Sequence, residues 1–244
     1  MKSPAYLLIA FLPLFMSGCT MMKVSVSQNR RIGVVALVPN KLQTKYVGVW
    51  AFSNKSGDAD VPEARFPETV STTTAEGLRR SGFTVVPVSY DPSALWAKYA
   101  KRHNTFGSYL TDNRLGDTER RAVGDELRGI LAAYRLDALA VVVPDRPNQG
   151  GEAAIGVGEY GFGIWAFDKE KVSTYAMTKV LILQGPALRT ITLRSIGNLR
   201  PMEGVGFKER FRDYAPEQQA QLLQAMRDGF ATSAGEVIPK MASP

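Results

Sequence analysis

Continuous apolar runs alternate with amphipathic stretches between Ile32 and Val143, and this alternation limits the folds that are open to the chain. Ile32–Val38 and Leu136–Val143 are apolar at nearly every position, as is typical of strands buried on both faces. Between them, Pro67–Ser81 and Asp117–Tyr134 carry apolar residues at helical spacing. The alternation therefore predicts an α/β or α+β fold in which helices pack on a sheet.

Weaker patterns complete this half of the chain. We expect two further strands, Tyr46–Phe52 and Phe83–Val88, the second at an edge or a strand end because it contains Pro87. A short helix is expected over Pro92–Lys101. The remaining stretches are polar or rich in Gly and are expected to be loops: Asn54–Pro62, Asn104–Gly116 and Asp145–Gly151.

The pattern changes in the C-terminal half. Ala154–Phe167 is rich in Gly and aromatic residues, and Thr174–Leu183 and Ala187–Ile196 are strand-like with a Gly185-Pro186 turn between them. We therefore expect antiparallel strands here, joined to a mixed sheet. The segment from Pro216 to about Pro239 predicts an amphipathic C-terminal helix.

The first 19 residues have the layout of a secretion signal. Lys2 precedes an apolar run that ends near Phe15, and the small residues Ser17 and Gly18 stand directly before Cys19. The run is shorter than the roughly 20 residues that a membrane-spanning helix needs. It suits the apolar part of a signal that is removed.

The segment Met16-Ser17-Gly18-Cys19 resembles the lipobox of bacterial lipoproteins. The resemblance implies cleavage before Cys19, a diacylglycerol on its sulfur and an acyl chain such as palmitate on its amino group. More than one chain is what stable membrane anchoring requires. Thr20 follows where Asp would direct retention, which resembles outer-membrane sorting. A lipid-anchored protein on the periplasmic face of the outer membrane is implied; the alternative is an ordinary secretion signal with an incidental cysteine.

This assignment divides the chain. We expect a signal peptide at 1–18, the lipidated cysteine and a tether at 19–31, a single globular domain at 32–239 and a tail at 240–244. Cys19 is the only cysteine. Its lipidation would leave no thiol for a nucleophile, a zinc–cysteine site or an iron–sulfur cluster, and no cofactor is expected.

The formal net charge of +7 raises the question of an anionic partner. A periplasmic location argues against nucleic acid. Anionic lipids, lipopolysaccharide or acidic groups associated with peptidoglycan fit better, but we favour the interpretation that the scattered charges only keep the surface soluble.

His103 is the only histidine, so a serine triad would have to use it. Its partners would come from Ser89 or Ser108 and from Asp91 or Asp112. The chain lacks the G-x-S-x-G turn that exposes such a serine. We therefore expect a histidine without a catalytic role, and a single histidine also argues against zinc.

Gly156-Val-Gly158-Glu-Tyr-Gly161 matches G-x-G-x-x-G. Dinucleotide binding needs this motif to open a helix, whereas Phe162–Phe167 has the pattern of a strand. We expect glycines that bend or thin a sheet. Whether the Gly- and aromatic-rich segment is a buried strand, an interaction surface or a membrane hairpin stays open.

Acidic residues give no clear site. Asp58, Asp60 and Glu63 share a segment but lack the spacing of a calcium loop. The carboxylates that a glycosidase would need can be sought among Glu126, Glu152 and Glu159, but nothing in their spacing pairs them.

The order of elements from Ile32 to Pro239, together with Cys19, resembles a group of periplasmic α/β domains. The group includes the lipoprotein activators of penicillin-binding proteins, the N-terminal domain of the Tol-system translocation protein and the curli-secretion lipoprotein. The resemblance implies a non-catalytic lipoprotein that binds an envelope protein or cell-wall partner. A subunit of an outer-membrane secretion or pore assembly is the alternative, and a cell-wall hydrolase is a weaker one.

Overall fold

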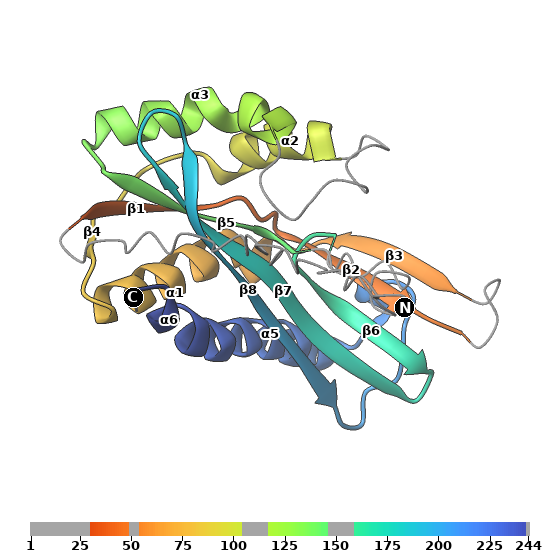
Figure 1. Ribbon diagram of the computed structural model, residues 1–244. Helices are drawn as coiled ribbons and strands as arrows, with labels where there is room; N and C mark the ends of the chain where they lie inside the picture. The colour runs from red at the N-terminus through yellow and green to blue at the C-terminus, as the bar shows by residue number, and fades with distance from the viewer. Residues whose placement is uncertain (1–29, 49–53, 104–116, 146–158, 243–244) are drawn as a thin grey trace, which may run out of the picture.

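The computed structural model describes residues 30–48, 54–103, 117–145 and 159–242. These residues form one mixed sheet of eight strands with helices on both faces (Figure 1). The strands are β1 (Arg31–Ala36), β2 (Lys41–Tyr46), β3 (Lys55–Asp60), β4 (Thr84–Val85), β5 (Ala138–Pro144), β6 (Phe162–Asp168), β7 (Lys171–Gln184) and β8 (Arg189–Met202). The helices are α1 (Phe66–Arg80), α2 (Pro92–His103), α3 (Asp117–Ala133), α5 (Pro216–Val237) and α6 (Pro239–Ala242), with 3-10 turns η2 (Pro62–Ala64) and η4 (Phe211–Asp213). The expected mixed sheet with packed helices is confirmed, as are the antiparallel C-terminal strands and the C-terminal helix.

The β7–β8 hairpin organises the sheet. β8 pairs with one edge of β7 along its whole length. The other edge of β7 pairs with β6 in its first half and with β5 in its second half. The two halves meet at Met177, whose N–H donates to the carbonyl of Gly161 (2.7 Å) and whose carbonyl accepts the N–H of Asp145 (2.9 Å). The sheet thus has a first wing, β5-β1-β4, and a second wing, β6-β2-β3.

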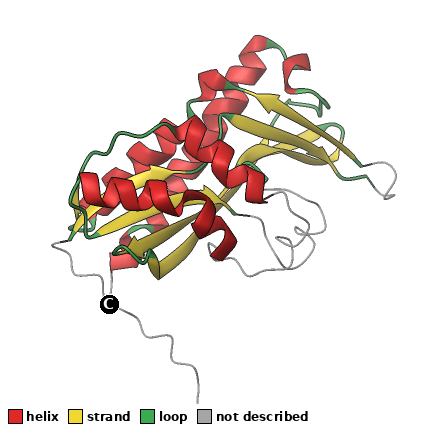
Figure 2. Cartoon of the chain, turned by 90° about the horizontal axis from the view of Figure 1, so that it is seen from above, coloured by secondary structure: helices red, strands yellow, loops and turns green. Residues whose placement is uncertain are grey.

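Two core clusters lie on opposite faces of the sheet. One packs α1, α5 and α6 against both wings, and the other packs α2 and α3 against the first wing. Figures 1 and 2 show these layers from the side and from above. Successive residues of a strand face opposite sides, so β1 sends Val34 to the first cluster and Val35 to the second. This explains why the runs that contain β1 and β5 are apolar throughout. Among the described residues, the second cluster takes no member from β2, β3 or β6.

Helix α1 agrees with its predicted range and shows how its ends are set. Its first N–H, that of Phe66, donates to the side-chain oxygen of Asn40 (2.8 Å), which replaces a helix cap within the adjacent sequence. After the helix ends, Gly82 has φ of +87°, a left-handed conformation that glycine adopts without strain.

Two predictions in the N-terminal half are wrong. Tyr46 ends a strand rather than beginning one, and residues 49–53 lie outside the described residues. Asn54–Pro62 is mostly the strand β3 rather than a loop, and it pairs antiparallel with β2. Both strands are largely polar, so backbone pairing along the second wing, rather than side-chain burial, decides their structure. Asn104–Gly116 lies outside the described residues.

Several elements differ from their predicted bounds. β4 has only two residues, although its predicted place at an edge of the sheet is confirmed. β8 continues to Met202, where the sequence predicts an end at Ile196. In the segment expected as a tail, Met241 belongs to α6 and is buried. Among the described residues no helix combines the length and apolar character needed to span a membrane.

Candidate functional site

The Gly- and aromatic-rich segment contains a strand with two different faces. In β6, Phe162, Ile164 and Ala166 are buried in the core under α1 and α5. Trp165 and Phe167 alternate with them and lie on the other face, with ring centroids 4.4 Å apart in an edge-to-face arrangement. The side chain of Phe167 is 60% exposed. The described part of the segment is therefore both a buried strand and an exposed aromatic surface.

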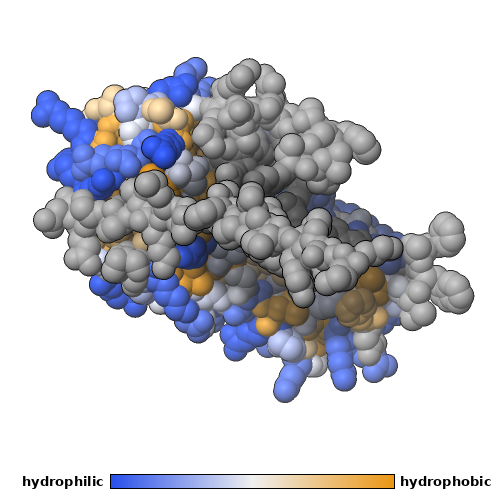
Figure 3. Space-filling model, in the orientation of Figure 1, coloured by the Kyte–Doolittle hydropathy of each residue, from blue (hydrophilic) through white to orange (hydrophobic). Residues whose placement is uncertain are grey.

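Neighbouring strands extend this surface. Trp165 lies opposite Ser173 of β7, which in turn lies opposite Pro201 of β8. Leu199, on the same face of β8, is 48% exposed. We call Trp165, Phe167, Leu199 and Pro201 the aromatic end. Figure 3 shows hydrophobic colour at the lower right of the molecule, where β6 ends and β7 begins, with hydrophilic side chains below it.

The glycine motif is not in the setting of a dinucleotide site. Gly156 and Gly158 lie outside the described residues. Gly161 has φ of +86° and leads directly into β6, not into a helix. The strand predicted after the motif is confirmed, and in the described part no helix N-terminus stands where a pyrophosphate would need one.

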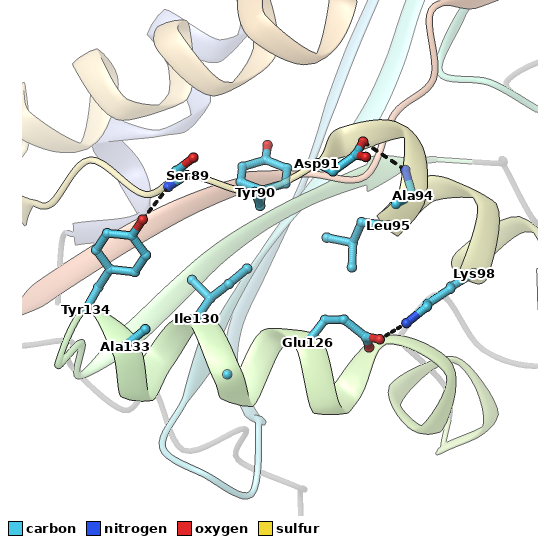
Figure 4. Close-up of a pocket in the computed structure, with 11 residues that line it drawn as sticks. Ser89, Tyr90, Asp91, Ala94, Leu95, Lys98, Glu126, Ile130, Ala133 and Tyr134 are labelled. Atoms are coloured by element: carbon cyan, nitrogen blue, oxygen red, sulfur yellow. Dashed lines mark hydrogen bonds and ion pairs between the residues drawn. The ribbon is translucent and has the colours of Figure 1, made fainter.

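A groove of about 470 Å³ lies between α3 and the segment that leads into α2 (Figure 4). Leu95 and Ile130, both nearly buried, are among its apolar lining residues. At one end, the ammonium group of Lys98 pairs with the carboxylate of Glu126. At the other end, the N–H of Ser89 donates to the hydroxyl of Tyr134 (2.9 Å). The hydrogen bond from Lys98 lowers the pKa of the Glu126 carboxyl, so this carboxylate is held ionised rather than ready to take a proton.

The residues considered for a triad do not assemble in the described part of the chain. One carboxylate oxygen of Asp91 accepts the N–H groups of Ser93 (2.9 Å) and Ala94 (3.0 Å), which makes it the cap of α2. Ser89 lies two residues away on the same segment. His103 is the last residue of α2, and its side chain, like Ser108 and Asp112, lies outside what the structure describes.

The acidic candidates are likewise used in surface contacts. Asp58 accepts a hydrogen bond from the hydroxyl of Tyr160 (3.0 Å), and Asp60 pairs with Lys41 (3.4 Å). Glu63 is exposed, and Glu152 lies outside the described residues. No group of three or more potential metal ligands occurs within the described residues.

Tyr90 ties the groove segment to the sheet. Its hydroxyl accepts the N–H of the fully buried Ala36 (2.7 Å) and lies 3.1 Å from the hydroxyl of Ser71. Burial raises the pKa of Tyr90 above its ordinary value. Sequence reasoning missed this residue because its partners lie 54 and 19 positions away.

We expect Tyr90→Phe to lower the free energy of unfolding by about 1–3 kcal/mol, because it leaves the N–H of Ala36 buried without an acceptor. Ser71→Ala, which removes only the other hydroxyl, should cost less.

The raised pKa of Tyr90 adds a pH test. Below about pH 10 both states keep the proton, and above it the unfolded state ionises first, so stability falls as pH rises toward the folded pKa. Urea unfolding from pH 8 to 11 should show a steeper loss for the unmodified protein than for the variant; equal slopes would contradict this role.

No protein-family model matches the chain, and no curated protein matches it. Solved structures that are similar to it include a PelC dodecamer from Paraburkholderia phytofirmans, with 6% identity and a TM-score of 0.34 over 90% of this chain and 91% of that one. Lipoprotein GNA1162 from Neisseria meningitidis has 12% identity and a TM-score of 0.33 over 83% and 99%. The LpoB C-terminal domain from Salmonella enterica has 8% identity and a TM-score of 0.26 over 71% and 85%. The activators of penicillin-binding proteins, to which the sequence was likened, are represented among these structures by LpoB.

Proposed function

We propose that the protein is a lipid-anchored envelope protein of the outer membrane that acts by binding a periplasmic protein, and that the aromatic end is its contact surface. The observation that carries the proposal is the exposure of Phe167 and Leu199 on one face at one end of the sheet. Large apolar side chains that gather on a surface mark contact sites more often than single exposed ones do. Trp and Phe are also enriched at protein interfaces.

The place of the aromatic end suits an anchored protein. A chain attached through Cys19 would enter the fold at β1. In the sheet, Ile32 of β1 pairs with Ala138 of β5, which pairs with Gln184, the last residue of β7. The aromatic end lies beside the start of β7, at the opposite end of the sheet in Figure 1. At about 3.3 Å per residue, β7 spans roughly 43 Å. The aromatic end therefore lies at the far end of the sheet from the strand at which an anchored chain would enter the fold, a position that leaves room for a partner.

Site-specific photocrosslinking in intact cells tests the proposal. A photoreactive phenylalanine analogue placed at position 167 or 199 should give one adduct of defined mass. The same analogue at Thr232, an exposed position on α5, is the matched control and should not give this adduct. Equal adducts at all three positions, or none at 167 and 199, would argue against a contact surface at the aromatic end. Phe167→Ser should then weaken binding of the captured protein in solution by about tenfold or more, as expected for a central aromatic contact.

A further inference from the structure

The outer edge of β8 is unpaired in the described part of the chain. β8 has 14 residues and, among the described strands, pairs only with β7, so its other edge faces no strand. Such an edge presents a row of N–H and carbonyl groups that can pair with another chain. Its last residues include Leu199 and Pro201, so the edge is continuous with the aromatic end.

The hydrogen bonds of Met177 show which groups of β8 point outward. Its N–H and its carbonyl both bond toward the opposite edge of β7, so its partner Gly197 receives no bond from it. Because antiparallel pairs alternate, the outward groups belong to Leu193, Ser195, Gly197 and Leu199. Two observations agree. Ser233 of α5 donates to the outward carbonyl of Gly197 (3.1 Å), so this carbonyl already has a partner, and an added strand would bond through Leu193, Ser195 and Leu199. Pro201, which has no N–H, falls in the same outward set.

Side chains along this edge sort by face. Leu193, Ser195 and Leu199 lie on the face of the aromatic end, and a side chain added at Gly197 would meet nothing within 4 Å. Arg194 and Arg200 lie on the other face, six residues apart. A strand laid along β8 would therefore meet apolar groups and open space on one face and positive charge on the other.

Charge decides which partner fits. β8 contains Arg189, Arg194 and Arg200 and no acidic residue, and none of the three makes an ion pair with a described residue. A second copy of β8 would bring like charges together, which disfavours self-pairing. An acidic strand would be attracted instead.

We propose that the outer edge of β8 binds an extended acidic segment of the partner protein by strand addition. This rests on the proposed function, because it describes the partner of the same surface. The segment would carry two carboxylates six residues apart, on the same face as Arg194 and Arg200 and opposite them. Between them, every second residue points to the other face, and these residues would be apolar where they lie beside Gly197 and Leu199. A spacing of five would turn one carboxylate to the apolar face.

Fluorescence anisotropy with the full mature protein in detergent tests this spacing. One nine-residue peptide carries acids at positions 1 and 7, and a second, of the same composition, carries them at 1 and 6. We expect the first to bind about three- to tenfold more tightly, with the difference reduced at high salt. Arg194→Ser and Arg200→Ser should each abolish the preference, whereas Arg212→Ser, an exposed arginine on η4, should leave it intact. Equal binding of the two peptides, or no binding of either, would overturn the proposal. The arginines would then serve only to prevent unwanted pairing of this exposed edge with other strands.

Strand addition itself has a test that does not alter the protein. N-methylation of those peptide amides that face β8 should weaken binding by at least about tenfold, since several hydrogen bonds are lost. Methylation of the alternate amides should not. If both methylated peptides bind equally well, the segment does not add as a strand. If Phe167→Ser weakens the captured partner while the β8 variants do not, the inference fails and the proposed function stands; if no partner is captured at 167 or 199, the proposed function fails on its own test.

Discussion

Phe162→Ala is expected to lower the free energy of unfolding by about 3–5 kcal/mol, the range for removing a buried aromatic ring. Phe162 is fully buried and stacks on Phe66 of α1, with ring centroids 4.1 Å apart and an interplanar angle of 3°. Its ring also lies 6.2 Å from that of Phe230 of α5. The ring thus fills the space between the second wing and two helices, and three elements cannot all move inward to close the cavity. Urea unfolding followed by circular dichroism measures the loss.

Phe167→Ala is a matched control in the same strand. It removes the same ring from a side chain that is 60% exposed, so it should change the unfolding free energy by no more than about 0.5 kcal/mol. Phe167→Ala should instead lower the amount of partner that is captured. Phe162→Ala should lower capture only to the extent that less of the protein is folded. Similar losses of stability in the two variants would mean that the alternation of faces along β6 is wrong.

The parts of the fold that the sequence predicts well are those whose own residues determine them. β1 and β5 lie within continuous apolar runs, because helices cover both of their faces. α1 and α3 follow from apolar stripes at helical spacing. The turn at Gly185 joins β7 and β8, as its Gly-Pro pair indicates. In each case the burial that stabilises the element is visible in a short window of sequence.

The elements that the sequence missed depend on partners far along the chain. β2 pairs with β6, about 120 positions later, and β3 then pairs with β2, although neither strand is apolar enough to indicate it. The predicted strand ends at Ile196, short of the end of β8, because Asn198, Arg200 and Pro201 are poor strand residues. One local signal was available: Ile196 and Met202 are both buried and an even number of residues apart, as expected on one face of a strand.

The candidate site shows the same limit. The sequence shows that the Gly-rich segment contains aromatic residues, but their division between core and surface requires the strand register. Leu199 was missed because it lay beyond the predicted strand. Asp91 is a candidate for a catalytic triad on residue type alone, yet it lies directly before Pro92, where a helix cap is the simpler interpretation.

Cys19→Ala is expected to release the protein from the membrane, and this is the largest effect of a single substitution on its location. Cys19 lies outside the described residues, so the expectation rests on the lipobox resemblance. Each buried methylene of an acyl chain contributes about 0.8 kcal/mol to membrane binding, and a single chain binds only marginally. Chains on both the sulfur and the amino group would therefore make anchoring effectively permanent, and losing the cysteine removes both. Detergent-phase partitioning and the mass of the N-terminal peptide measure the change.

If cleavage fails in Cys19→Ala, that variant keeps its signal peptide. Two controls therefore separate the effect of losing the acyl chains from the effect of a retained signal peptide. Thr20→Asp keeps the cysteine and should stay in the detergent phase, while shifting the protein between membranes if the sorting resemblance holds. A chain that begins at Thr20 behind an ordinary secretion signal should enter the aqueous phase. If Cys19 is unmodified in the mature wild-type protein, the signal is an ordinary secretion signal and the cysteine is incidental.

Because the aromatic end lies at the opposite end of the sheet from the start of β1, the chain without its anchor should bind the captured partner in solution as tightly as before. It should crosslink less in cells, because anchoring concentrates the protein where the partner is.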